Sequence, residues 1–206
     1  SKGKSMASGL ENFLSDIGKG KISQTDETAF EVGTNLAVTE GAVVFENAIF
    51  QLIQYKNKFS EVKQTPILFV PPCINKYYIL DLTESNSLVK HALENKNQVF
   101  LVSWKNINDP ECALTWDDYV ETGVITAIDK VREISNVEKI NTLGFCIGGT
   151  LLSCAAGVIA KQKRNTINSI TLMASLLEFS DPGILKIFID ESSISIRESA
   201  IGQKGV

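Results

Sequence analysis

Between residues 66 and 173, short uninterrupted apolar runs alternate with longer segments that have an apolar position every three or four residues. The first two runs are typical of strands buried on both faces of a sheet, and the longer segments are typical of helices with one buried side. The predicted strands cover residues 67–70, 98–104, 140–144 and 167–173, and the predicted helices cover residues 87–96, 117–134 and 150–161. This order predicts an α/β fold, in which a mostly parallel sheet carries helices on both faces.

The residues before this core predict a helix and a pair of strands. Four apolar side chains would form one stripe on a short helix: Leu10, Phe13, Leu14 and Ile17. We expect this stripe to dock on the main domain rather than to bind a partner. Residues 42–46 and 50–55 are consistent with an antiparallel pair of strands at one edge of the sheet.

The alternation of strands and helices stops after residue 177. Asp181-Pro182-Gly183 predicts a turn, and no pattern for a sheet-closing strand follows it. We therefore divide the chain into an N-terminal helical and polar segment (1–40), an incomplete α/β core (41–177) and the start of a further region (178–206). A sheet that stops after its fourth parallel strand exposes an apolar edge, so we expect aggregation when the chain is produced alone.

Composition narrows the class of protein. Of the 206 residues, 44% are hydrophobic and 21% are charged, which excludes disorder for most of the chain. The net charge of −4 argues against binding of nucleic acid through a general basic field. No apolar run approaches the roughly 18–20 residues of a membrane span. Residues 1–16 lack an apolar signal core, so we do not expect secretion, and the first residue is not Met, which indicates a fragment or a processed chain.

The cysteines and the histidine bear on metals and on the redox compartment. Cys73, Cys112, Cys146 and Cys154 show no close-spaced pairing pattern, and His91 is the single histidine. A zinc site is therefore poorly supported, and we predict no metal. Free thiols in a reducing cytoplasm are the simplest interpretation.

One motif carries chemistry, Gly144-Phe145-Cys146-Ile147-Gly148, between a predicted strand and a predicted helix. It matches the nucleophile elbow G-x-S-x-G with cysteine in place of serine. The sharp turn leaves no room for side chains two residues away, which explains Gly144 and Gly148. The sulfur of Cys146 would lie at a helix N-terminus, where an anion is favoured, and the Ile147 amide would face a developing oxyanion. The alternative is a glycine-rich turn with a buried, unreactive cysteine.

An elbow needs a second oxyanion donor from the loop after an earlier strand. Pro71 and Pro72 follow the strand 67–70, and proline has no N–H. The donor is therefore Cys73, Ile74 or a later residue, and we favour Ile74. The alternative for this loop is a rigid turn with no catalytic role.

A general base is missing from the pattern. His91 precedes Cys146, whereas proteins built on this elbow have the order nucleophile, acid, histidine. It also lies inside a predicted helix, so we expect a histidine with no role in the chemistry. Because no other candidate is present, we expect the chain to be inactive on its own.

The remaining conspicuous side chains favour structural roles. Cys112 and Cys154 are expected to be small packing residues, and Cys73 is open to the same interpretation. Trp104 and Trp116 are expected to pack rather than to recognise a ligand. The carboxylates of Asp117-Asp118 suit the first turn of a helix, where the helix dipole favours negative charge.

Several strings together resemble the polyhydroxyalkanoate synthases, and most of all the class I enzymes. They are PPCINKYYILDL (71–82), VFLVSWKN (99–106), TWDDYV (115–120) and GFCIGGT (144–150), with ISQTDETAFEVG (22–33), AVTEGAVVFEN (37–47) and DPGILKIFIDE (181–191) in the flanking regions. The resemblance covers residues 22–202, and the motifs stand in the family's order.

The resemblance implies an α/β-hydrolase core with Cys146 as the acylated nucleophile, cut at the start of the cap region (178–206). It implies an acyltransferase that polymerises (R)-3-hydroxyacyl-CoA, 3-hydroxybutyryl-CoA above all, into polyester. Coenzyme A is the leaving group, and no cofactor is implied. It further implies cytoplasmic homodimers on the surface of polyester granules. The family's catalytic Asp and His lie well downstream of the elbow, and no residue of this chain matches either.

Two other functions remain open at this point. One is a thioesterase or hydrolase of the same fold with a cysteine nucleophile, in which water replaces the hydroxyl acceptor. The other is a non-catalytic, granule-associated protein that holds only the front part of the fold.

Overall fold

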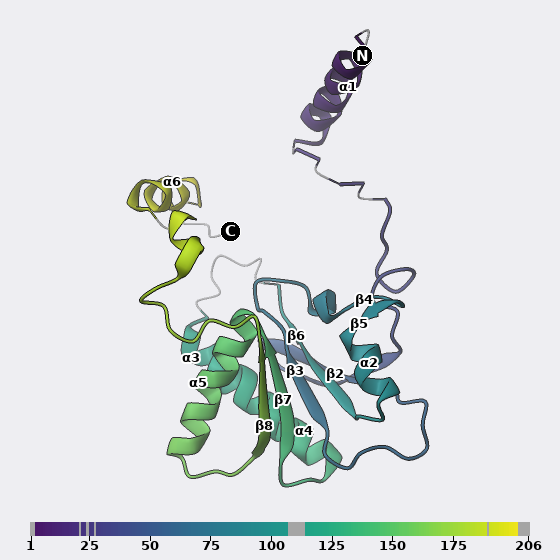
Figure 1. Cartoon of the computed structure of the whole chain (residues 1–206), viewed down its shortest axis with the longest axis vertical. Coiled ribbons are helices and arrows are strands. Elements are labelled where there is room, and N and C mark those ends of the chain that lie inside the picture. Colours follow the sequence, from purple (N-terminus) through teal and green to yellow (C-terminus); the bar gives the residue numbers. More distant parts are fainter. Residues whose placement is uncertain are drawn as a thin grey trace.

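The computed structural model describes residues 3–201 apart from residues 21, 24, 27, 107–113 and 189. At its centre is a six-stranded sheet in the order β1-β2-β6-β3-β7-β8 (Figure 1). β2 pairs antiparallel with both of its neighbours, and β6, β3, β7 and β8 are parallel. The strands are β1 (Gly41–Glu46), β2 (Phe50–Tyr55), β3 (Ile67–Val70), β6 (Val99–Trp104), β7 (Ile140–Phe145) and β8 (Ile167–Met173). The predicted strands are thus confirmed, with boundaries within one residue.

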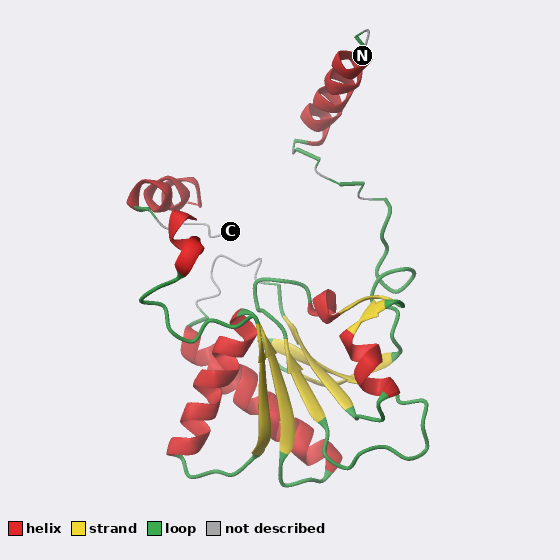
Figure 2. Ribbon diagram, in the orientation of Figure 1, coloured by secondary structure: helices red, strands yellow, loops and turns green. Residues whose placement is uncertain are grey.

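Helices cover both faces of the sheet, as predicted (Figure 2). The helices on one face are α3 (Trp116–Asp118), η2 (Tyr119–Ile125), α4 (Thr126–Ser135) and α5 (Ile147–Lys161), and those on the other are η1 (Tyr77–Leu80) and α2 (Leu88–Glu94). Side chains of β3 alternate between two buried clusters, because successive residues of a strand point to opposite faces. Leu68 and Val70 pack with α4 and α5, whereas Phe69 packs with α2.

The predicted helix 117–134 is present but is not a regular α-helix. It begins as α3, whose N-terminus is capped by Thr115 and Asp118, with the Asp118 carboxylate accepting from the Thr115 amide at 2.8 Å. The expected helix-start role of Asp117-Asp118 is thereby confirmed. The chain then widens into the π-helical segment η2, where Gly123 lies against the indole of Trp104. This contact joins residues far apart in sequence, so hydrophobic periodicity could not predict it.

A small two-stranded sheet between β3 and α2 was not predicted. β4 (Asp81–Thr83) and β5 (Asn86–Ser87) form it, and Asp81 is its buried anchor. The Asp81 carboxylate accepts hydrogen bonds from Thr39 Oγ1 at 2.6 Å and from Ser87 Oγ at 2.5 Å. Ser87 also caps α2 by accepting from the Lys90 amide at 2.9 Å. Strands of two or three residues are too short to show a period in sequence.

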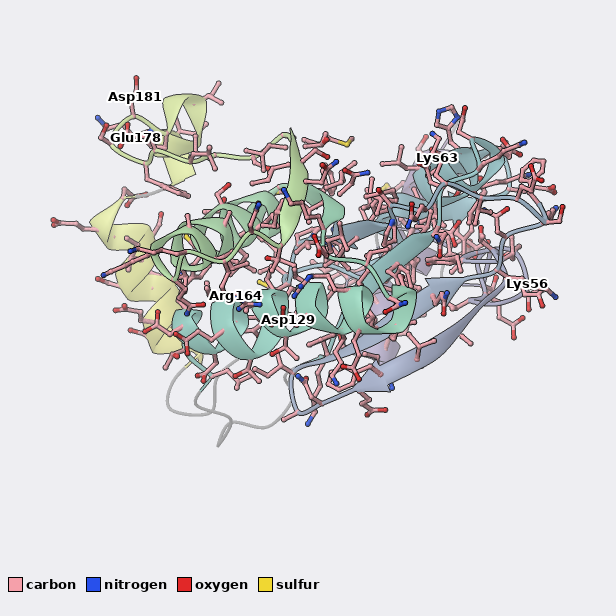
Figure 3. The ribbon with its side chains drawn as sticks, turned by 90° about the horizontal axis from the view of Figure 1, so that it is seen from below. Lys56, Lys63, Asp129, Arg164, Glu178 and Asp181 are labelled. Carbon is pink, nitrogen blue, oxygen red and sulfur yellow. The ribbon has the colours of Figure 1, made fainter. Side chains whose placement is uncertain are left out.

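An ion-pair cluster ties α4 to the turn that follows α5. Asp129 Oδ1 pairs with Arg164 and, at 3.1 Å, with Arg132 Nη1. Figure 3 shows Asp129 and Arg164 side by side, with Lys56 and Lys63 on a distant part of the molecule. The cluster fixes α4 against α5 at the end of the sheet away from the cysteine turn described below.

The N-terminal helix α1 (Lys4–Lys19) forms, but the expectation that it docks on the main domain is wrong. It stands apart from the sheet (Figure 1), and the side chains of its apolar stripe are 58–61% exposed. The described residues that follow are mostly exposed, and several of them bond to one another, as Glu31 does with Asn35. Because this polar connection buries little apolar surface, it supplies no force that would hold α1 against the sheet.

β8 forms an exposed edge of the sheet, as expected for the last parallel strand. It pairs with β7 on one side, and Ile170 and Leu172 are 44% and 38% exposed. The chain then continues into η3 (Gly183–Phe188) and α6 (Glu191–Ile201), which lie away from the sheet (Figure 1). Among the described residues, no helix combines the length and the continuous apolar character of a membrane span.

Candidate functional site

The turn between β7 and α5 has the backbone geometry of a nucleophile elbow. Cys146 has φ 54° and ψ −130°, and α5 begins at the next residue, Ile147. Positive φ is rare for a residue with a side chain and indicates stored strain. Two hydrogen bonds hold the turn: the Cys146 amide donates to the Met173 carbonyl, and the Gly149 amide donates to the Cys146 carbonyl, both at 2.9 Å. The helix starts three residues earlier than predicted, so the sulfur-bearing residue directly adjoins its N-terminus.

Three glycines make this turn possible. A Cβ on Gly144 would lie 2.4 Å from Gly149 Cα, and a Cβ on Gly148 would lie 2.2 Å from the Val70 carbonyl oxygen. The expected need for glycine at both positions is confirmed. Sequence reasoning did not single out Gly149, where a Cβ would lie 1.9 Å from Ser175 Oγ. The feature of the sequence that could have identified Gly149 is its place as the second glycine of the Gly148-Gly149 pair.

The sheet topology brings the cysteine turn next to the loop after β3. β3 lies between β6 and β7, and Val70 at its end is paired with Gly144. The chain passes from β3 to β6 on one side and later to β7 on the other side. Loops at such a switch point diverge and leave a crevice at the carboxyl ends of the strands, where ligands bind in open α/β sheets.

The two cysteines that follow β7 and β3 differ in exposure. The Cys146 side chain is exposed, whereas Cys73, in the loop after β3, is half-buried and packs against the core. Burial raises the pKa of the Cys73 thiol, its own backbone amide offsets part of that rise, and the neighbouring Cys146 adds to it. Cys73 is therefore a neutral thiol in a packed position, which agrees with the packing interpretation, and Cys146 is the accessible one.

The loop after β3 presents its amides toward different partners. The Asn75 amide donates to the Pro72 carbonyl at 3.3 Å, and the Lys76 amide donates to Asn75 Oδ1 at 2.8 Å. Within the described residues, the Ile74 amide makes no hydrogen bond, and its side chain is 82% exposed. Ile74 and Ile147 therefore remain the predicted pair of oxyanion donors.

The other candidate residues lie elsewhere. Cys154 is exposed on the outer side of α5, so the expectation that it is a packing residue is wrong. The same helix buries Leu151, Leu152 and Ala155, and successive residues are about 100° apart around a helix, which turns position 154 outward. Trp104 is buried as expected, but Trp116 is 43% exposed. Cys112 lies outside the described residues.

A cavity of about 590 Å³ lies at the opposite edge of the sheet from Cys146. Residues after β2 and at the end of α2, such as Lys56, Phe59 and Leu93, line it. It contains no cysteine or histidine, and no group of three potential metal ligands occurs among the described residues. Cys146 therefore lies at the carboxyl ends of the strands and outside this cavity.

His91 lies on α2, with an exposed side chain 3.5 Å from Asn95 Nδ2. α2 packs on the face of the sheet opposite α5. We therefore expect His91→Gln to change the rate of substrate turnover by only a few-fold, since glutamine retains a polar side chain at this surface. Steady-state kinetics of the full-length product of the gene that encodes this chain would check this. A loss of about a thousandfold, the scale of a missing general base, with unchanged circular dichroism would contradict it.

Comparisons with known proteins identify the family. Residues 66–193 match the family model for the alpha/beta hydrolase fold, and residues 1–92 match the model "Poly-beta-hydroxybutyrate polymerase (PhaC) N-terminus". The chain belongs to the α/β-hydrolase fold family. Within that fold, its sequence places it among the poly(3-hydroxyalkanoate) polymerases.

The relatives support that assignment along the whole chain. The chain is 53% identical to poly(3-hydroxyalkanoate) polymerase subunit PhaC of Cupriavidus necator over 202 residues, which are 98% of this chain and 34% of that protein. It is 38% identical to poly(3-hydroxyalkanoate) polymerase 2 of Ectopseudomonas oleovorans, with 100% of this chain and 37% of that protein covered. The chain thus spans about a third of the length of these relatives.

Proposed function

We propose that the protein containing this chain is an acyltransferase that polymerises (R)-3-hydroxyacyl-CoA into polyhydroxyalkanoate and releases coenzyme A. The observation that carries the proposal is a cysteine in a strained elbow, in a chain 53% identical to a poly(3-hydroxyalkanoate) polymerase. Within the proposal, 3-hydroxybutyryl-CoA is the expected substrate, and Cys146 is the acyl acceptor.

Two acyl transfers make up the proposed cycle. The Cys146 sulfur attacks the thioester carbonyl carbon, the bond from that carbon to the sulfur of coenzyme A breaks, and the departing thiolate takes up the proton that Cys146 gives up. A hydroxyl oxygen then attacks the acyl-cysteine, the bond to Cys146 breaks, and the sulfur recovers the proton of the hydroxyl. The amides of Ile147 and Ile74 would stabilise the oxyanion of each tetrahedral intermediate.

Cysteine suits this reaction thermodynamically as well as kinetically. An acyl-cysteine is a thioester, close in energy to the CoA thioester that supplies it. Transfer to a hydroxyl converts the thioester into an oxoester, which is downhill and drives chain growth. A serine nucleophile would hold the acyl group as an oxoester and lose that driving force. Sulfur also needs less help from a base than a serine hydroxyl does.

The setting of the reaction is part of the same proposal. We infer a cytoplasmic homodimer at the surface of a polyester granule, on the basis of the resemblance to the polymerases. The two acyl transfers themselves call for no cofactor, since coenzyme A enters as part of the substrate and leaves as a product.

The test is the fate of the acyl group in the full-length product of the gene that encodes this chain. With 3-hydroxybutyryl-CoA, we expect free CoA together with insoluble polyester. Butyryl-CoA is the matched control: it lacks the 3-hydroxyl group, so it is expected to acylate the enzyme and release about one equivalent of CoA without polymer. Free 3-hydroxybutyrate as the main product would establish a thioesterase instead. Absence of CoA release from both substrates would establish a non-catalytic protein.

A further inference from the structure

One buried hydrogen bond links the core of the sheet to the loop after β3. Trp104, at the end of β6, donates from Nε1 to the carbonyl oxygen of Pro71 at 2.8 Å. Trp104 is 8% exposed, so this bond is shielded from water. A buried donor and acceptor that satisfy each other fix the relative position of the two segments, because separating them leaves both unpaired.

The indole of Trp104 is held on several sides. Its ring lies 6.2 Å from the ring of Phe50, edge-on at 65°, and 5.3 Å from that of Tyr119 at 59°. Gly123 closes the remaining side, because a Cβ there would come within 2.8 Å of Cζ3 of the indole. A ring packed this closely cannot swing, so its N–H has one direction.

The same carbonyl of Pro71 touches the helix that carries the elbow. A Cβ on Gly148 would lie 2.6 Å from the Pro71 oxygen, so the first turn of α5 rests directly on it. The carbonyl of Pro71 therefore lies between Trp104 and Gly148, the residue that directly follows Ile147. It is the point where β6, the loop after β3 and the elbow meet.

Few hydrogen bonds within the loop after β3 hold its backbone in place near Pro71. Pro71 and Pro72 have no N–H, so neither can donate a backbone hydrogen bond. Within the described residues, the first backbone hydrogen bond donated inside the loop comes from Asn75 and is long, at 3.3 Å. Cys73 and Ile74 lie between these points. Their position relative to the Ile147 amide depends on how the Pro71 carbonyl is held.

We propose that Trp104 is a positioning residue for the acyl-transfer reaction. By holding the Pro71 carbonyl, it sets the loop so that its donor, Ile74 in our assignment, and the Ile147 amide face the same oxygen of the acyl group on Cys146. This inference rests on the proposed function. It explains why a tryptophan with a hydrogen bond, and not only an apolar ring, occupies the end of β6.

Trp104→Phe in the full-length enzyme removes the N–H and keeps an aromatic ring. Two rates are compared: CoA release from 3-hydroxybutyryl-CoA, and alkylation of Cys146 by iodoacetamide, followed by mass spectrometry of the Cys146 peptide. Alkylation displaces iodide from a saturated carbon and forms no oxyanion. We expect kcat for CoA release to fall about 10- to 100-fold with KM within a few-fold, somewhat less than removal of an oxyanion donor itself. The alkylation rate is expected to stay within about two-fold, since it reports only the thiol and the elbow.

Phe50→Leu is the matched control, because it loosens the same aromatic cluster and leaves the hydrogen bond intact. In this variant the rate of CoA release divided by the rate of Cys146 alkylation is expected to equal that of the parent enzyme. The proposal would be overturned if Trp104→Phe left this ratio unchanged, whether or not both rates fell together. It would also be overturned if Phe50→Leu lowered the ratio as much as Trp104→Phe does. If Trp104→Phe is insoluble, benzothienylalanine is placed at position 104, where it replaces the N–H by sulfur and keeps the shape of the ring. The same ratio of CoA release to Cys146 alkylation is then measured, with the same expected result. Failure of the proposed function is seen separately, as CoA release that survives Cys146→Ala.

Discussion

Cys146→Ala is expected to abolish CoA release from 3-hydroxybutyryl-CoA and all polymer formation, with a loss of about 10⁴-fold or more in rate. The side chain is exposed at the start of α5, and the glycines around it leave room for the backbone without depending on its sulfur. Alanine fits the same space, so the fold is expected to persist. The measurement is thiol release in the full-length enzyme, together with gravimetric or turbidity detection of polyester.

Two variants serve as controls for that experiment. Cys154→Ala removes an exposed thiol from the same helix, and it is expected to keep most of the activity. Cys146→Ser keeps a nucleophilic atom at the elbow but is expected to be severely impaired, because a neutral hydroxyl is a far weaker nucleophile at pH 7. Comparable turnover in Cys146→Ala and the parent would remove Cys146 from the mechanism.

Gly148→Ala is expected to lower the free energy of unfolding by about 3 kcal/mol and to inactivate the enzyme. The added Cβ would lie 2.2 Å from the Val70 oxygen and 2.7 Å from the Pro71 carbonyl carbon. Both are backbone atoms, which cannot rotate out of the way as the end of a side chain can. The loop after β3 must therefore move away from α5, and the placement of its amides relative to Cys146 is lost with it.

The control for this substitution lies on the same helix. Gly157 is exposed, and a Cβ there meets no atom within 4 Å. Gly157→Ala is expected to stabilise the protein by up to about 1 kcal/mol, since alanine favours helix over glycine. Urea titrations of both variants and the parent, followed by circular dichroism, make the comparison. A midpoint for Gly148→Ala equal to that of the parent would show that the contact of α5 with the loop is not tight.

The sequence was most informative where local pattern and tertiary structure agree. The strands could be located because buried parallel strands are nearly continuous apolar runs, and the elbow could be located because its glycines have a steric cause. The start of α5 was placed too late because Gly148-Gly149 is a poor helix former and resembles a loop in sequence. What requires glycine at both positions is the close approach of Val70, Pro71 and Ser175, which lie far away in the sequence.

Other features depend on partners that no local pattern contains. The apolar stripe of α1 has the period of a docked helix, but docking also depends on where the connecting residues place the helix, and none of the described side chains of α1 is buried. The π-helical segment η2 contains Gly123, which lies against Trp104, 19 residues earlier in the chain. The role of Trp104 was likewise out of reach, since its acceptor, Pro71, is 33 residues away.

The strained backbone of Cys146 also has a meaning for evolution. A residue at φ 54° and ψ −130° sits there at a disadvantage of about 1–3 kcal/mol relative to a relaxed conformation, and glycine would escape most of it. Selection for stability alone would therefore replace this side chain by a hydrogen atom. A thiol at this position can be maintained only by selection on what the thiol does. Its loss is therefore the change that would separate a working enzyme from a descendant that only folds.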